Sequence, residues 1–158
     1  MLNLPAPEIT RNQTSMKQVN DVEILLINNN AADAETIIGA LQQVKLSGKL
    51  VHLTTGEEGL DFIFGRGRFY NQGKRKFPKV IFLDIKLPEI EGIEVLRHIK
   101  ANEITRVIPV VVLTSSTEKK DIINSYNLAV NSFVVKPADA AQFTKIVGEL
   151  ASYWLLIN

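Results

Sequence analysis

Short apolar runs alternate with amphipathic segments along most of this 158-residue chain, and this alternation is the feature that most constrains its fold. Each run is only about four residues long and rich in β-branched side chains, which favours a strand covered on both faces over a buried helix. A fifth run, Leu50–Leu53, is weaker and alternates with polar residues, as an edge strand does. The four stronger runs, which we expect to be fully buried, are Ile24–Ile27, Val80–Leu83, Val110–Leu113 and Phe133–Val135.

Helical spacing of apolar residues fills the segments between these runs. The pattern predicts helices over residues 34–44, 57–64, 93–100 and 117–126, and a last helix that begins near Asp139. Ser116 and Thr117 stand before the fourth helix as a capping pair. Strands and helices therefore alternate five times, which predicts one doubly wound α/β domain with a parallel sheet. We place this domain at residues 21–158, after a flexible, polar leader over residues 1–20.

Composition narrows the function classes further. The formal net charge is +1, which gives no general argument for nucleic acid or membrane partners, and the chain has no cysteine. We find no apolar run near the roughly 18 residues that a membrane span needs, and no apolar core of a secretory signal in the leader. We therefore expect a cytoplasmic protein. Five basic residues lie between residues 65 and 78, and we interpret that segment as a solvated loop.

Four of the predicted strands are each followed by a polar side chain. These residues are Asn28, Asp84, Thr114 and Lys136. Because the carboxyl ends of parallel strands meet at one edge of a sheet, we expect the four side chains to form a site there. Asp84 is the only carboxylate among them, and a carboxylate beside a hydroxyl and an ammonium suits the acceptance of a phosphoryl group. The Lys136-Pro137 sequence suggests a restrained peptide bond, with the cis isomer as one option.

The segments around these residues resemble the response-regulator receiver domains of two-component signalling. Residues 82–92 (FLDIKLPEIEG) resemble the motif around the phosphoacceptor aspartate, and residues 112–116 (VLTSS) and 133–137 (FVVKP) resemble the other two signatures. The stretch over residues 54–64 and the loop after it resemble the small regulators that serve bacterial phytochromes. This resemblance implies the flavodoxin-like (βα)5 fold with strand order 2-1-3-4-5.

The resemblance also implies roles for individual residues. Asp84 would be the phosphoacceptor, and Thr114 and Lys136 would contact the phosphoryl group. Phe133 would be the aromatic switch that turns inward on activation, although a purely structural role in the core is an equal alternative. Lys86 would offer its backbone carbonyl to the Mg²⁺ ion, and its side chain would modulate hydrolysis.

The sequence departs from the receiver pattern just after the first strand. Receivers normally have two acidic residues there that bind Mg²⁺ together with the acceptor, but this chain has Asn28 and Asn29. Asparagine offers an amide oxygen without charge, so we expect Mg²⁺ binding by Asp84, Asn29, the Lys86 carbonyl and, through water, Asn28 to be weak or lost. Phosphorylation of Asp84 should then be slow. The pocket is expected either to contain a direct Asp84–Lys136 ion pair or to imitate a charge-neutralised, active form.

We therefore predict a stand-alone response regulator that is not an enzyme and acts by binding partners. The expected partners are a histidine kinase, with a phytochrome as one candidate, and a second copy of the chain. The dimer contact would involve the fourth helix, the last strand, the last helix and the apolar tail at residues 153–157. Two alternatives are a fully competent relay receiver and a phosphorylation-independent interaction module. An enzyme of the same topology is disfavoured, because residues 28–33 contain no glycine for a phosphate loop and Lys86 stands where a dehalogenase-type phosphatase needs a second aspartate.

Overall fold

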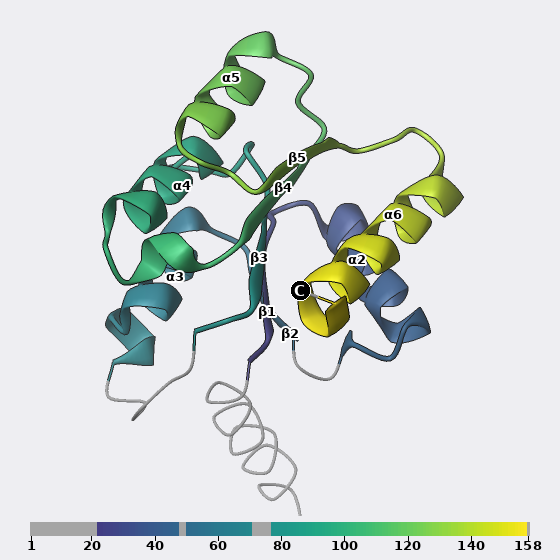
Figure 1. Ribbon diagram of the computed structural model, residues 1–158, viewed down its shortest axis with the longest axis horizontal. Coiled ribbons are helices and arrows are strands. Elements are labelled where there is room, and N and C mark those ends of the chain that lie inside the picture. Colours follow the sequence, from purple (N-terminus) through teal and green to yellow (C-terminus); the bar gives the residue numbers. More distant parts are fainter. Residues whose placement is uncertain (1–21, 48–49, 71–76, 158) are drawn as a thin grey trace, which may run out of the picture.

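A five-stranded parallel sheet forms the centre of the protein (Figure 1). The computed structural model describes residues 22–47, 50–70 and 77–157. The strands lie in the order β2-β1-β3-β4-β5, which confirms the predicted doubly wound topology. They are β1 (Ile24–Ile27), β2 (Leu50–Leu53), β3 (Val80–Leu83), β4 (Val110–Thr114) and β5 (Ser132–Val135).

The three inner strands are buried along their whole length, as expected for strands with neighbours on both sides and helices on both faces. The prediction that β5 is fully buried is wrong. Its first three residues are half-buried, and Val135 is exposed, because β5 pairs only with β4 and forms an edge of the sheet. The other edge is β2, as its alternating sequence predicted.

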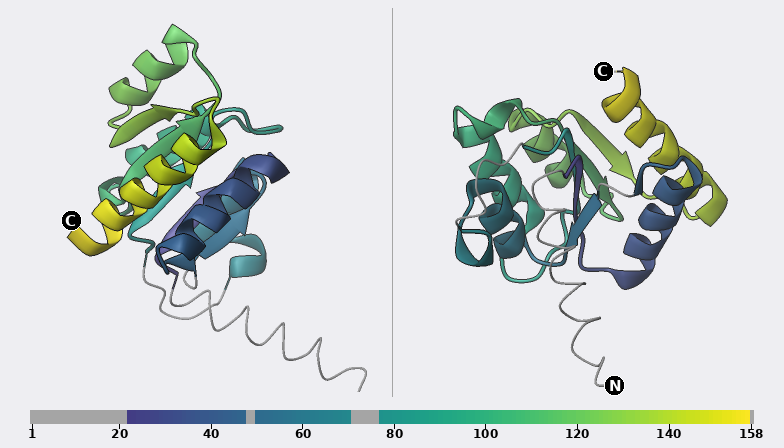
Figure 2. Two further views of the ribbon diagram at one scale, coloured as in Figure 1. Left: turned by 90° about the vertical axis from the view of Figure 1, so that its right-hand side faces the viewer. Right: turned by 90° about the horizontal axis from the view of Figure 1, so that it is seen from below.

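Helices cover both faces of the sheet, and Figures 1 and 2 show the two layers. One face is covered by α2 (Ala31–Gln43) and α6 (Ala140–Ser152), which pack against each other. The opposite face is covered by α3 (Gly56–Phe64), α4 (Gly92–Ala101) and α5 (Lys119–Asn127). Since side chains alternate along a strand, β1 contributes Ile24 and Leu26 to the core under α2 and α6, and Leu25 and Ile27 to the core under α3 and α4.

Local sequence explains where most of the helices begin. The side chains of Asn30, Thr55 and Asp139 accept hydrogen bonds from backbone N–H groups in the first turns of α2, α3 and α6. The fourth predicted helix, α5, begins at Lys119 rather than at residue 117 and has no side-chain cap hydrogen bond. Ser116 instead accepts a hydrogen bond from the Glu118 N–H at 3.3 Å, ahead of the helix.

The apolar tail continues α6 as a short π-helical segment, Tyr153–Ile157. Trp154 and Leu155 pack against the core under α2 and α6. Tyr153, Leu156 and Ile157 are exposed, with relative exposures of 47%, 69% and 76%. The tail therefore has one packed side and one side that is open in the described part of the chain.

Three sequence predictions fall partly or wholly outside the described residues. These are the leader over residues 1–20, the limits of the single domain, and part of the basic loop. The leader and the domain limits therefore stay predictions. Within the described part of that loop, Arg66 pairs with Asp61 at 3.6 Å and Arg68 with Glu58 at 3.0 Å. No helix within residues 22–47, 50–70 and 77–157 is long and apolar enough to span a membrane.

Candidate functional site

The polar residues that follow the strands meet at one edge of the sheet, as the parallel topology requires. Backbone hydrogen bonds continue each strand by one residue: the Asp84 N–H donates to the Ile27 carbonyl at 3.0 Å, and the Lys136 N–H donates to the Thr114 carbonyl at 2.7 Å. On the far side of β1, the Asn28 N–H donates to the Leu53 carbonyl at 3.0 Å. The predicted constellation is therefore brought together by the strand ladder itself.

Asp84 is the central group of this edge, and it is 7% exposed. Burial raises the pKa of its carboxyl above the ordinary value, because a carboxylate loses hydration in the protein interior. Hydrogen bonds from the Thr114 hydroxyl and from the backbone N–H groups of Lys86 and Ile85 act in the opposite direction and lower that pKa. The side chain is thus a buried acid whose charged form is stabilised by three hydrogen-bond donors.

The asparagines after β1 have local structural partners. Asn28 is 2% exposed, and its side-chain oxygen accepts a hydrogen bond from the Asn30 N–H at 2.7 Å. The Asn28 carbonyl accepts a hydrogen bond from His52 Nε2 of β2 at 2.8 Å, so His52 helps to hold the turn after β1. Asn29 is exposed, and Asn30 caps α2. One amide oxygen of the expected metal site is therefore already used within the turn.

Lys136 does not pair with Asp84, so the first of the two predicted pocket states, a direct ion pair between them, is wrong. Its Nζ atom forms an ion pair and hydrogen bond with Oδ1 of Asp33 in the first turn of α2. Asp33 was not predicted from the sequence, because it lies in the first turn of α2 and does not directly follow a strand. The signal was present, since a residue in the first turn of a helix that starts at the carboxyl end of β1 lies beside the same edge.

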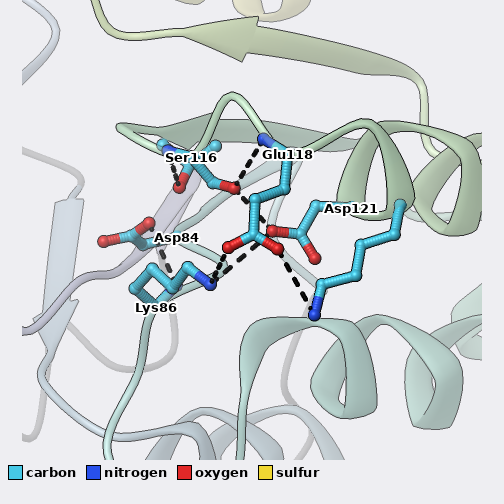
Figure 3. Close-up of polar contacts among 7 residues, drawn as sticks. Asp84, Lys86, Ser116, Glu118 and Asp121 are labelled. Atoms are coloured by element: carbon cyan, nitrogen blue, oxygen red, sulfur yellow. Dashed lines mark hydrogen bonds and ion pairs between the residues drawn. The ribbon is translucent and has the colours of Figure 1, made fainter.

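The second lysine of the site also has partners away from Asp84 (Figure 3). Lys86 Nζ lies 3.4 Å from Oε1 of Glu118 and 3.7 Å from Oδ2 of Asp121. Asp121 is buried and accepts a hydrogen bond of 2.5 Å from the Ser116 hydroxyl. Through these contacts the loop after β3 is joined to the start of α5. The pairing of Lys86 with Glu118 and Asp121 was not predicted from the sequence.

Phe133 is half-buried in β5 and packs against the core under α3 and α4. The suggested cis isomer of the Lys136–Pro137 bond is wrong, because the described residues contain no cis peptide bond. Within the same residues, no three His, Cys, Asp or Glu side chains gather closely enough to hold a metal ion.

Comparison with known proteins shows which family the chain belongs to. Residues 24–148 match the response regulator receiver domain family. FilR2 of Methanothrix harundinacea is 38% identical over 132 residues, which cover 84% of this chain and 83% of FilR2. Rcp1 of Synechocystis sp. is 35% identical over 132 residues, which cover 84% of this chain and 88% of Rcp1.

Solved structures show the same likeness. The phosphorylated cyanobacterial phytochrome response regulator RcpA matches with a TM-score of 0.78 and 35% identity, over 85% of this chain and 94% of RcpA. The Mn²⁺-bound form of Rcp1 matches with a TM-score of 0.78 and 34% identity, over 85% and 95% of the two chains. These relatives agree with the resemblance of residues 54–64 to regulators that serve phytochromes. The chain belongs to the response regulator receiver family of two-component signalling.

Proposed function

We propose that this chain is a cytoplasmic receiver in which Asp84 accepts a phosphoryl group and Mg²⁺-dependent phosphorylation is slow. The observation that supports this proposal is the setting of Asp84. Its buried carboxylate stands at the carboxyl end of the central strand β3, within reach of the Thr114 hydroxyl. The edge has the nucleophile and hydroxyl of a phosphoryl acceptor but lacks acidic neighbours directly after β1.

The chemistry proposed for Asp84 is nucleophilic. A carboxylate oxygen attacks the phosphorus of the donor, the bond between phosphorus and the donor's leaving group breaks, and the leaving group departs with the electron pair. The hydroxyl of Thr114 donates a hydrogen bond to a phosphoryl oxygen, and the Lys136 ammonium balances its charge. Phe133 then turns inward in response. The chain is a signalling module of the kind that receiver domains generally are, rather than an enzyme with its own substrate.

The metal site is the weak part of this arrangement. In the family, Mg²⁺ neutralises charge on the phosphoryl group, and here Asp84, Asn29 and the Lys86 carbonyl would hold it, with Asn28 acting through water. These donors do not fit a tight Mg²⁺ site, since they include one carboxylate and the Asn28 side-chain oxygen is engaged by the Asn30 N–H. The relative Rcp1 has been solved with bound Mn²⁺. We infer that this chain binds divalent cations more weakly than receivers with two acids after β1.

Acetyl phosphate labelling tests the proposal. Wild type, Asp84→Asn and an Asn28→Asp/Asn29→Asp variant would be incubated with the donor and millimolar Mg²⁺, and intact mass would be followed over time. We expect slow addition of one phosphate to wild type, none to Asp84→Asn, and faster addition to the variant with both acids restored. Labelling of wild type as fast as the restored variant would refute the slow-phosphorylation proposal. A phosphate that persists in Asp84→Asn would refute the role of Asp84.

Signal output is proposed to occur through protein contacts. A histidine kinase, with a phytochrome as the candidate suggested by the relatives, would supply the phosphoryl group. A homodimer would form through α5, β5, α6 and the tail, and the exposed Leu156 and Ile157 side chains of the tail favour such a contact. Sedimentation of wild type and of a Leu156→Ser/Ile157→Ser variant tests it. A wild type that is monomeric at micromolar concentration would exclude this dimer. A wild type that is equally dimeric with and without the phosphodonor would favour a phosphorylation-independent interaction module.

A further inference from the structure

Both lysines of the site are paired with carboxylates other than Asp84. Lys136 Nζ pairs with Asp33, and Lys86 Nζ lies 3.4 Å from Glu118 and 3.7 Å from Asp121. In residues 22–47, 50–70 and 77–157, Asp84 has no ion pair of its own. The cation that would balance a phosphoryl group on Asp84 is therefore held by another acid.

Two helices, α2 and α6, hold the Lys136 ammonium in position. Asp33 is only 11% exposed at its side chain, and its backbone N–H donates to the Asn30 side chain at 3.0 Å, which fixes the start of α2. The Phe143 ring of α6 lies beneath the ammonium, with 5.7 Å between Nζ and the ring centroid. Such a ring face attracts a cation. Lys136 thus lies against α2 and α6, on one side of the sheet edge.

The backbone of Lys136 is held by a different partner from its ammonium. The Lys136 N–H donates to the Thr114 carbonyl at 2.7 Å, which ties its backbone to the end of β4, the strand between β5 and β3. Its flexible four-carbon side chain can move the ammonium by rotation while the backbone stays in place. Asp33 also lies close enough to Asp84 for its negative charge to raise the pKa of Asp84. The two carboxylates therefore lie close enough to interact through their charges.

We propose that Asp33 is a positioning residue that holds Lys136 in the resting state and competes for it with a phosphoryl group on Asp84. This inference rests on the proposed role of Asp84 as acceptor. The added negative charge of the phosphoryl group draws the ammonium away from Asp33. The first turn of α2 then loses an ion pair, so the acceptor site is coupled to the face formed by α2 and α6 as well as to Phe133.

Acylation of Lys136 tests the ion pair without any phosphorylation. Wild type, Asp33→Asn and the control Glu35→Gln, which removes an exposed acid from the same helix, would be treated with sulfosuccinimidyl acetate. Peptide mass spectrometry would compare Lys136 with the exposed Lys145. We expect Asp33→Asn to raise the relative labelling of Lys136 by about threefold or more, and Glu35→Gln to leave it unchanged. In wild type alone, high salt should raise the labelling too, which keeps the test valid if the variant folds poorly.

Phosphorylation of Asp84 by acetyl phosphate at saturating Mg²⁺ tests the competition. We expect Asp33→Asn to be labelled faster than wild type and Glu35→Gln at the wild-type rate. Unchanged acylation of Lys136 in Asp33→Asn, with no salt effect in wild type, would overturn the ion pair. Increased acylation with an unchanged phosphorylation rate would overturn the competition. Absence of phosphate from every variant would instead overturn Asp84 as acceptor, while the acylation result would still decide whether Asp33 holds Lys136.

Discussion

Gly92 lies so close to the backbone after β3 that it offers a sharp test of the fold around Asp84. A Cβ atom at this position would lie 2.0 Å from the Asp84 carbonyl oxygen and 2.7 Å from Cα of Ile85. Both are backbone atoms, which cannot rotate aside as the end of a side chain can. To restore an ordinary separation, the start of α4 or the segment after β3 must move by about 1 Å.

The size of the effect follows from two contributions. Forcing an extra carbon into a packed region typically costs about 1–3 kcal/mol. The same shift disturbs the hydrogen bond from the Gly92 N–H to the Ile85 carbonyl, now 2.8 Å long, and such a bond contributes about 1 kcal/mol. We therefore expect Gly92→Ala to lower the free energy of unfolding by roughly 2–4 kcal/mol.

Urea unfolding followed by Trp154 fluorescence and circular dichroism would measure this loss. Gly39→Ala is the matched control, since a Cβ there meets nothing within 4 Å and the position is inside α2. The control should gain about 1 kcal/mol from the higher helix propensity of alanine. A Gly92→Ala protein within about 0.5 kcal/mol of wild type would refute the reasoning, because it would mean that the backbone at Asp84 has room to spare.

Three further predictions concern the ionisable and capping groups. Because burial raises the pKa of Asp84 in the folded state, its ionisation destabilises the fold as the pH rises through that pKa, and the penalty is absent below the ordinary value of 3.8. Asp84→Asn should therefore be more stable than wild type in urea at about pH 7 but not at about pH 3, and an equal gain at both would contradict this. Ser116→Ala should cost about 1–3 kcal/mol by depriving the buried Asp121 of its donor, while Ser115→Ala, at an exposed position, should change thermal unfolding little. Asp139→Ala should cost about 1 kcal/mol by uncapping α6, and Asp139→Asn should restore most of it, so equal losses in chemical denaturation would argue against capping.

The sheet could be predicted from the sequence because burial on both faces leaves a visible pattern. The run Val80–Leu83 has no polar side chain, which is compatible with a central strand and with little else at that length. Phe133 and Val134 gave the same pattern in β5, yet they are half-buried. Their apolar character reflects the helices that they face, and a run of four residues does not reveal whether a second strand lies beside it.

The candidate site was predictable only where strand ends fix it. Asp84, Thr114 and Lys136 lie together because parallel strands end at the same edge. The partner of Lys136 depends instead on how the first turn of α2 is oriented, and 103 residues separate the two side chains. Similarly, the pairing of Lys86 with Glu118 depends on two loop conformations that no local pattern specifies.

The sheet also acts as a wall between two separate interiors. Residues next to each other in β1 belong to different cores, with Leu25 on the α3–α4 side and Leu26 on the α2–α6 side. Changes confined to one interior need no compensating repacking in the other, so their effects on stability should largely add. A lineage of such proteins could therefore alter the helices on one flank to suit a new partner while the opposite flank, and the edge they share, stay as they were.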